Sequence, residues 1–432
     1  MSFLNLLVVL AVAVVAPLVV RAIPVVRVPS PVLEIVAGIV LGPSVFGWVT
    51  IDPPVQVLAL IGLAFLLFLA GLEIDVHRLR GRPLRLALAG FALSFAIAIG
   101  LGVAMAAAGL TTAPLLVAIT LCATSLGLVV PVLKDADAID GDAGQLVVAA
   151  ASIADFGAVI LLSLFFSAES AGIGPMLLLL GGLALVAVLV TLALMRAGAT
   201  FPAMRALRQL QDTTAQIRVR FAVVLLVGFV ALAQALGFEA ILGAFLAGAV
   251  LRLVDTDAAM THPYFAAKLD AIGFGFVVPV FFVASGVRFD AGALFASAAA
   301  IVQVPLFLLA LVLVRGLPAL LYRQRLGARN TIAAGLLQAT SLPFVVAAVA
   351  IGQELGVLSP ATGAALIAAG LASVLLFPSA ALAVLHGAPA AVTPPVPAES
   401  GQPHASDSTC GSPPCSAAAS IDRTRSGRGE KP

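Results

Sequence analysis

The chain has 432 residues, of which 62% are hydrophobic and only 10% charged, with a formal net charge of +2. Soluble domains carry about 25% charged residues, so this composition and a mean hydropathy of +1.16 exclude a soluble globular protein and indicate a polytopic membrane protein. The small net charge, without a basic run, gives no reason to expect a nucleic-acid partner. The cysteines, Cys122, Cys410 and Cys415, form no disulfide framework or metal-ligand pattern, and no cofactor is expected.

Apolar windows of about 20 residues predict an all-α protein with about 13 transmembrane helices. The first window lacks the basic residues that precede a cleaved signal peptide, so it is interpreted as a membrane helix. The boundary between the eighth and ninth windows is the weakest, because little more than Gly237 separates them. The windows are 4–20, 31–50, 55–73, 84–109, 112–133, 144–167, 174–195, 218–236, 238–253, 271–287, 292–314, 330–352 and 360–386.

The positions of Lys and Arg predict the orientation of the protein. Before the last window ends, every Lys and Arg except Arg288 falls at one set of alternate window ends, and Arg315 is placed at the end of window 292–314. The N-terminus is therefore expected outside and the C-terminus in the cytoplasm. The expected location is the cell membrane (plasma or inner membrane), with lipid as a partner of the multi-pass protein.

A short motif occurs twice inside apolar windows and predicts two broken helices. Residues 123–132 read ATSLGLVVPV and residues 339–348 read ATSLPFVVAA. A Thr-Ser pair next to Gly127 or Pro343 disfavours a continuous helix, because Gly adds backbone freedom and Pro lacks an N–H. In lipid such an interruption is tolerated only where the freed backbone groups face protein, water or an ion. One broken helix in each half of a chain indicates the binding site of a secondary transporter.

Two further matches extend the repeat. LEIVAG at 33–38 matches FEAILG at 238–243, and GLEID at 71–75 matches GVRFD at 286–290, with Arg288 in the place of an acid. Together with the Thr-Ser motif they recur in the same order at offsets between 205 and 216 residues. We interpret this as an internal duplication. Because the first GLEID-type segment leads into a cytoplasmic loop and the second into an external one, the two repeats have inverted topology.

The duplication predicts the domain organisation. Residues 1–196 form the first inverted repeat plus a connecting seventh helix, 197–217 a polar cytoplasmic linker, and 218–387 the second inverted repeat. Residues 388–432 are rich in Pro, Ser, Ala and Gly, so they are expected to be a disordered cytoplasmic tail.

Asp155 is the strongest candidate for chemistry. It lies in the middle of window 144–167, too far from either end for its short side chain to reach the interface. A carboxylate there is either protonated or paired with a cation. A site that takes a proton or a metal ion, but not both, is what an exchanger needs, so an alkali cation is expected at Asp155. The alternative is a structural, protonated Asp that bonds a backbone carbonyl.

Other polar residues are secondary candidates. The hydroxyls of Thr124 and Ser125, with unwound backbone carbonyls, offer hard oxygen ligands for an alkali ion beside Asp155, and Thr340, Ser341 and Pro343 support the second broken helix. Ser and Thr also simply pack helices in membranes. A further set of acids lies nearer window ends, where a solvated, capping or ion-paired carboxylate is ordinary; these secondary candidates are Glu34, Glu239 and Glu73.

As a set, several stretches resemble the monovalent cation:proton antiporter-2 family of prokaryotic Na⁺(K⁺)/H⁺ antiporters. They are LEIVAGIVLGPSVFG at 33–47, LAFLLFLAGLEID at 63–75, ATSLGLVVPVLKD at 123–135, SIADFGAVILL at 152–162, AILGAFLAG at 240–248 and GFGFVVPVFFVASG at 273–286. The resemblance implies a core domain with two crossed, broken helices, an essential acid at Asp155, elevator-like movement and a homodimer. The expected partners are monovalent cations and protons, Na⁺ or K⁺ being undecided.

The chain departs from the family at two positions. Many electrogenic members carry two adjacent acids on the sixth helix and a basic residue on the tenth, whereas here Ala154 precedes Asp155 and 271–287 contains no basic residue. We therefore expect electroneutral exchange of one proton per cation.

Other function classes remain less favoured. A Na⁺-coupled symporter of an organic solute with a similar inverted-repeat fold, or a gated K⁺ efflux system, remains open as an alternative. An intramembrane protease is not expected, because 174–195 holds no acid and the four histidines lie at window ends, in loops or in the tail. We therefore expect a transporter and not an enzyme.

Overall fold

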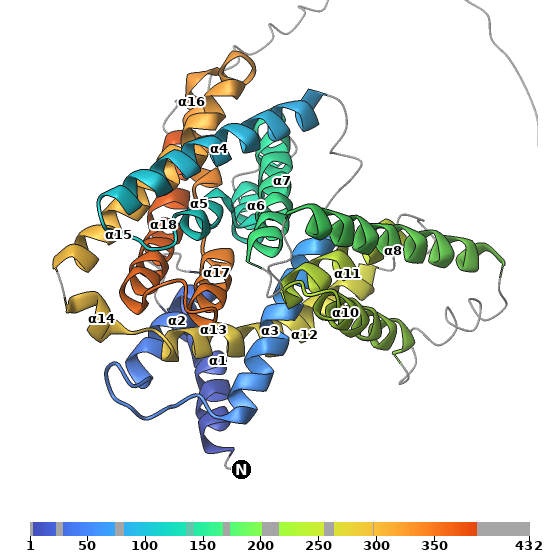
Figure 1. Ribbon diagram of the computed structural model, residues 1–432, viewed down its shortest axis with the longest axis horizontal. Coiled ribbons are helices and arrows are strands. Elements are labelled where there is room, and N and C mark those ends of the chain that lie inside the picture. The colour runs from blue at the N-terminus through green and yellow to red at the C-terminus, as the bar shows by residue number, and fades with distance from the viewer. Residues whose placement is uncertain are drawn as a thin grey trace, which may run out of the picture. The chain divides into compact units, whose positions relative to one another are not determined.

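The computed structural model contains only helices as regular elements within the residues it describes (Figure 1). Most of the predicted linker 197–217 and the whole predicted tail 388–432 lie outside the described residues. The described residues are 3–22, 29–73, 82–135, 138–139, 141–166, 173–200, 216–254, 263–296 and 298–386.

Each of the thirteen predicted windows overlaps helical structure, although the helix of window 31–50 ends at Leu41. The first half contains α1 (Leu4–Ala22), α2 (Ser30–Leu41), α3 (Pro53–Leu72), α4 (Arg82–Ala107), α5 (Pro114–Cys122), α6 (Leu126–Asp135), α7 (Asp142–Phe165) and α8 (Ile173–Thr200). The second half contains α10 (Ile217–Ala235), α11 (Ala240–Val254), α12 (Pro263–Ile272), η1 (Gly273–Val277), α13 (Val278–Val287), α14 (Ala291–Phe295), α15 (Ala298–Leu311), η2 (Val312–Gly316), η3 (Leu317–Tyr322), α16 (Arg323–Gln338), α17 (Pro343–Glu354) and α18 (Pro360–His386).

The number of membrane spans is not fixed by these elements. In the described part of the chain, eight helices are long and apolar enough to cross a membrane, and shorter apolar helices accompany them. The all-helical class is therefore confirmed, while the count of thirteen spans stays a prediction.

Among the window ends that differ from the structure, the end of window 292–314 matters most for the site. The helix of window 292–314 does not stop there but continues through η2 and η3 into α16, and the chain turns at Gly327, where φ is +74°. Pro318 explains the irregular winding, because it has no N–H to donate to the carbonyl of Val314. Arg315 consequently lies inside a helical segment and not at its end.

The helices gather into two bundles, each built from both halves of the chain. The first bundle contains α1, α2, α3, α10, α11 and α13, which contact one another. The second bundle contains α4–α7 and α15–α18, drawn blue-green and orange-red in Figure 1. Between the bundles, α7 contacts α11, and α8 contacts both α7 and α11. The two broken helices belong to the second bundle.

Glycines allow two helix pairs of the first bundle to meet at backbone distance. A Cβ on Gly38 or Gly286, where α2 meets α13, would lie within about 2.2 Å of a carbonyl oxygen on the other helix. The same holds for Gly71 and Gly248, where α3 meets α11. The pairs correspond if α2 is the repeat partner of α11 and α3 of α13, which supports an inverted duplication.

These contacts correct the alignment of one repeat. Gly38 corresponds in packing to Gly248 and not to Gly243, with which the sequence match pairs it, and Gly243 contacts α10 instead. The sequence register between α2 and α11 was therefore wrong by five residues. As a result, Glu34 and Glu239 do not occupy equivalent positions.

Replacing Gly286 by Ala tests the close contact between α2 and α13. The new Cβ would meet backbone atoms, which cannot rotate away, so we expect a cost of about 1–3 kcal/mol and a lower melting temperature of the detergent-solubilised protein. Gly228→Ala on α10 is the matched control, because no atom lies within 4 Å of its Cβ position. Equal melting temperatures of the two variants would contradict the predicted contact.

Candidate functional site

Both predicted helix breaks are present. α5 ends at Cys122 and α6 begins at Leu126, while α16 ends at Gln338 and α17 begins at Pro343. Pro343 lies in the first turn of α17, where a missing N–H leaves no helical hydrogen bond unmade. It therefore starts the second half-helix, directly after the break that the sequence predicted.

The two breaks cross and bond to each other. Ser125 N donates to the carbonyl oxygen of Thr340 at 2.9 Å, and Thr124 Oγ1 donates to the carbonyl oxygen of Gln338 at 2.7 Å. These residues and Ser341 are buried, and Ser341 Oγ has no hydrogen-bond partner among the described residues. Each extended segment thus satisfies backbone groups that the other break frees.

Asp155 reaches the crossing from α7. Its Oδ1 accepts from Thr124 N at 3.2 Å and its Oδ2 accepts from Leu126 N at 3.4 Å. These N–H groups belong to the start of α6, where the helix dipole favours negative charge. The carboxylate is therefore held at the one end of the half-helix that stabilises an anion.

Arg315 places a second charge at the crossing, and the sequence analysis misplaced it. The side chain is 1% exposed. Its Nε donates to Thr124 Oγ1 at 2.8 Å, and its two terminal nitrogens donate to Ser94 Oγ at 3.1 Å and to the carbonyl oxygen of Ala150 at 3.3 Å. The guanidinium thus joins α4, the first break and α7 to η2.

Window 271–287 contains no basic residue, and the buried guanidinium at the crossing comes from the helical segment that follows that window. When spans are predicted from hydropathy windows, a charged residue near the edge of an apolar run is assigned to the membrane–water interface. The sequence did contain a sign that the helix continues past Arg315, because Leu317, Leu320 and Leu321 extend the apolar pattern by more than a turn.

Ser373 is the counterpart of Asp155 at the second break. Its Oγ accepts from Ser341 N at 3.2 Å and donates to the carbonyl oxygen of Gly370 at 2.8 Å. It lies on α18, as Asp155 lies on α7, two residues beyond Leu371, the position that the 216-residue offset of the Thr-Ser motif gives for Asp155. One break is therefore capped by a carboxylate and the other by a neutral hydroxyl.

A cavity of about 90 Å³ lies between the bundles and contains the predicted site. Asp155, Thr124 and Ser125 form its polar end, and Glu73 lies at the C-terminal end of α3. The remaining lining is largely apolar: Pro31, Leu66, Leu67, Leu69, Ala70, Leu126, Val159, Phe245, Phe274, Phe282, Pro343 and Phe344. The arrangement connects the carboxylate with the side of the protein on which α3 ends.

The ligand chemistry at this end is that of hard oxygens. Within the described ranges, no three His, Cys, Asp or Glu residues come together as a metal cluster. The polar residues that line the cavity are Asp155, Thr124, Ser125 and Glu73, and the Thr124 hydroxyl is also held by Arg315 Nε and the Gln338 carbonyl oxygen. Such a set suits a singly charged alkali ion better than a zinc-type metal.

The structure does not bring all candidate acids to this cavity. Glu34 is buried on α2, one turn from the lining residue Pro31, but does not itself line the cavity. Glu239 precedes α11. Burial raises the pKa of the Glu239 carboxyl, and the Glu354 carboxylate raises it further. Of the three secondary acids, only Glu73 shares the cavity with Asp155.

The chain matches known proteins over most of its length. The family model described as sodium/hydrogen exchanger, transmembrane, matches residues 10–385. The chain is 33% identical over 389 residues to the putative Na(+)/H(+) antiporter YjbQ of Bacillus subtilis, covering 86% of this chain and 62% of that protein. It is 28% identical over 264 residues to the Na(+)/H(+)-K(+) antiporter GerN of Bacillus cereus, covering 60% of this chain and 65% of that protein.

The fold also matches a solved structure. The sodium proton antiporter MjNhaP1 from Methanocaldococcus jannaschii superimposes with a TM-score of 0.66, covering 89% of this chain and 98% of that one. At 18% identity this likeness establishes the fold alone. It confirms the predicted class of an all-helical membrane protein with an exchanger-type architecture.

Cys122 at the end of α5 provides a test of the Arg315 contacts. Arg315→Gln leaves buried hydrogen-bonding groups unpaired at about 1–3 kcal/mol, and each 1.4 kcal/mol of lost local stability makes opening about tenfold more frequent. In a background with Cys410→Ser and Cys415→Ser, we expect buried Cys122 to react with a small thiol reagent at least about tenfold faster in this variant. Arg325→Gln, at an exposed position, is the control. Unchanged protection of Cys122 would contradict this role for Arg315.

Proposed function

The chain belongs to the sodium/hydrogen exchanger family, and on that premise we propose that it exchanges a monovalent cation, Na⁺ or K⁺, for protons by alternating access. The observation that carries the proposal is the Asp155 carboxylate, which caps a broken helix and lines a cavity between the bundles. The proposed protein is a transporter and not an enzyme. We expect it as a homodimer in the cell membrane, with the N-terminus outside and the C-terminus in the cytoplasm.

Competition at Asp155 gives the coupling. An ionised carboxylate accepts the N–H groups of Thr124 and Leu126 and still has lone pairs for a cation from the cavity. A proton neutralises the same group and removes the attraction for a cation. Because an uncompensated charge is costly in a low dielectric, the site moves across the membrane only with a proton or a cation bound to Asp155.

The charge count at the crossing supports one proton per cation. Arg315 remains protonated in proteins, so it contributes a fixed positive charge and carries no proton. Ala154 offers no second acid beside Asp155. The proposed exchange is therefore electroneutral.

The bundle arrangement supplies a route for alternating access. The crossing lies wholly in the second bundle, whereas α3, α11 and α13 of the first bundle form the facing wall of the cavity. We propose that the second bundle moves against the first and carries Asp155 from one face of the membrane to the other.

Asp155→Asn tests the proposal. The amide keeps the size of the side chain but neither titrates nor attracts a cation, so exchange of Na⁺, K⁺ and Li⁺ is expected to fall to the background of vesicles without the protein. The measurement is cation-dependent dequenching of a pH-sensitive dye in everted vesicles.

Asp270→Asn on α12 is the matched control, because this exposed aspartate lies outside the crossing. It is expected to retain exchange at the wild-type rate. Near-normal exchange by a well-expressed Asp155→Asn protein would refute the proposed site.

A further inference from the structure

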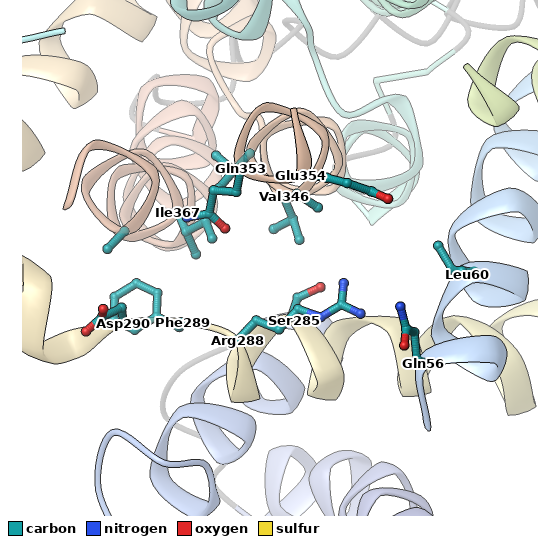
Figure 2. Close-up of a pocket in the computed structure, with 13 residues that line it drawn as sticks. Gln56, Leu60, Ser285, Arg288, Phe289, Asp290, Val346, Gln353, Glu354 and Ile367 are labelled. Atoms are coloured by element: carbon teal, nitrogen blue, oxygen red, sulfur yellow. The ribbon is translucent and has the colours of Figure 1, made fainter. Parts of the chain in front are cut away.

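A second cavity, of about 290 Å³, lies between the same two bundles (Figure 2). The first bundle lines it with the beginning of α3 and the end of α13, and the second bundle with α17 and α18. Its polar residues are Gln56, Ser285, Arg288, Asp290, Gln353 and Glu354. Nothing in the exchange mechanism so far uses these side chains.

The second cavity approaches the crossing from the opposite end of α3. Gln56 lies near the start of α3 and Glu73 follows its last residue, about 25 Å apart along a helix rising 1.5 Å per residue. On α13, Phe282 lines the first cavity and Ser285 the second, so less than one helical turn separates the two linings. The second cavity is thus placed as the access route from the other face.

The two cavities carry side chains of opposite charge at equivalent positions of the inverted repeats, and these ends of the cavities are called their mouths below. Gly71 and Gly286 make equivalent backbone contacts, and two residues beyond them stand Glu73 and Arg288. Glu73 lines the first cavity and Arg288 the second. The inverted repeat therefore places an acid at one mouth and a guanidinium at the other.

Arg288 faces an acid across the second cavity. Arg288 caps the end of α13, and Glu354 is the last residue of α17, so the two charges belong to different bundles (Figure 2). Neither forms an ion pair with another described residue. Burial lowers the pKa of the Arg288 guanidinium and the Glu354 carboxylate opposes this, so the two groups sense each other. Asp290 also lines the cavity, where its Oδ1 accepts from Ala293 N at 2.7 Å, and it is the same in all the variants compared below.

We infer that Arg288 and Glu354 set, with opposite signs, the apparent affinity for the transported cation from the face on which the second cavity lies. Glu354 attracts cations into the mouth, and Arg288 repels them and offsets that attraction. The inference rests on the proposed cation exchange and names two side chains that tune it from one face only.

Electrostatics fixes the size and the limits of the effect. A unit charge about 10 Å from a cation changes its local concentration roughly twofold at the dielectric constant of water and roughly fifteenfold at an effective value of about 20. The field acts on a proton and an alkali ion alike. It therefore shifts the half-saturating Na⁺ concentration on one face where Asp155 is already ionised, and the shift cancels where protons compete strongly for Asp155. The end point of exchange is set by the stoichiometry and stays unchanged.

The test compares half-saturating Na⁺ concentrations in right-side-out and everted vesicles, at a pH high enough that protons do not compete with Na⁺ for Asp155. Arg288→Gln is expected to lower the value by roughly two- to fifteenfold on the face of the second cavity, and Glu354→Gln to raise it by a similar factor on that face. Arg288→Lys keeps the charge and should match the wild type, and the double variant Arg288→Gln/Glu354→Gln should return close to it. Glu73→Gln, the repeat-related control, should raise the value on the opposite face.

Added choline chloride separates charge from structure, because the Debye length is about 10 Å at 0.1 M salt and screening shrinks only an electrostatic shift. Shifts of the same sign in Arg288→Gln and Glu354→Gln, or equal shifts on both faces, would overturn the inference, as would unchanged values in both variants. In those cases normal exchange by the wild type would leave the proposed function standing. A wild-type protein that moves no protons in response to Na⁺ or K⁺ would overturn both.

Discussion

The structure depends on how two interrupted helices satisfy each other inside an apolar surrounding. Half-helices that end in a bilayer expose backbone groups that lipid cannot bond. Here Ser125 N and Thr124 Oγ1 use carbonyls of the other break, and Arg315 holds Thr124 from a third helix. The arrangement requires polar groups where the two breaks cross. It also requires hydrogen-bond acceptors for the N–H groups at the N-terminal ends of the two half-helices. Asp155 is such a partner, so the proposed ion site follows from the same requirement that makes the crossing stable.

The residues to which we assign the proposed function are those at which the two inverted repeats differ. The glycine contacts of α2 with α13 and of α3 with α11 keep the repeat relationship in the first bundle, which serves as a frame. At the crossing, Asp155 caps one break and Ser373 the other, so the proposed exchange of a proton for a cation involves one half alone. At the two mouths, Glu73 and Arg288 differ in sign at equivalent positions. A symmetric frame with one titrating group suits a single site presented in turn to two faces.

Sequence patterns predicted what depends on local chemistry. Hydropathy located the helices, and the Thr-Ser motifs with Pro343 located the breaks, because backbone preferences act within a few residues. Asp155 was identifiable because a short acidic side chain cannot leave the membrane interior. The rest depends on tertiary packing. From the sequence, Arg315 was assigned to the membrane interface, whereas in the structure the helix continues beyond it. The register of α11 was wrong by five residues because Glu239 and Gly243 resemble the Glu34–Gly38 motif, although Gly248 is the residue that packs like Gly38.

The most direct test of the account is the number of protons released when Na⁺ binds to the purified protein. Calorimetric titration in two buffers of different ionisation enthalpy measures this number without transport. If Asp155 holds either a proton or a cation, and Arg315 carries no exchangeable proton, release should approach one proton per bound Na⁺ below the pH at which Asp155 has already ionised. It should vanish, together with the binding heat, in Asp155→Asn. Binding of Na⁺ without proton release, or release that persists in Asp155→Asn, would contradict the account.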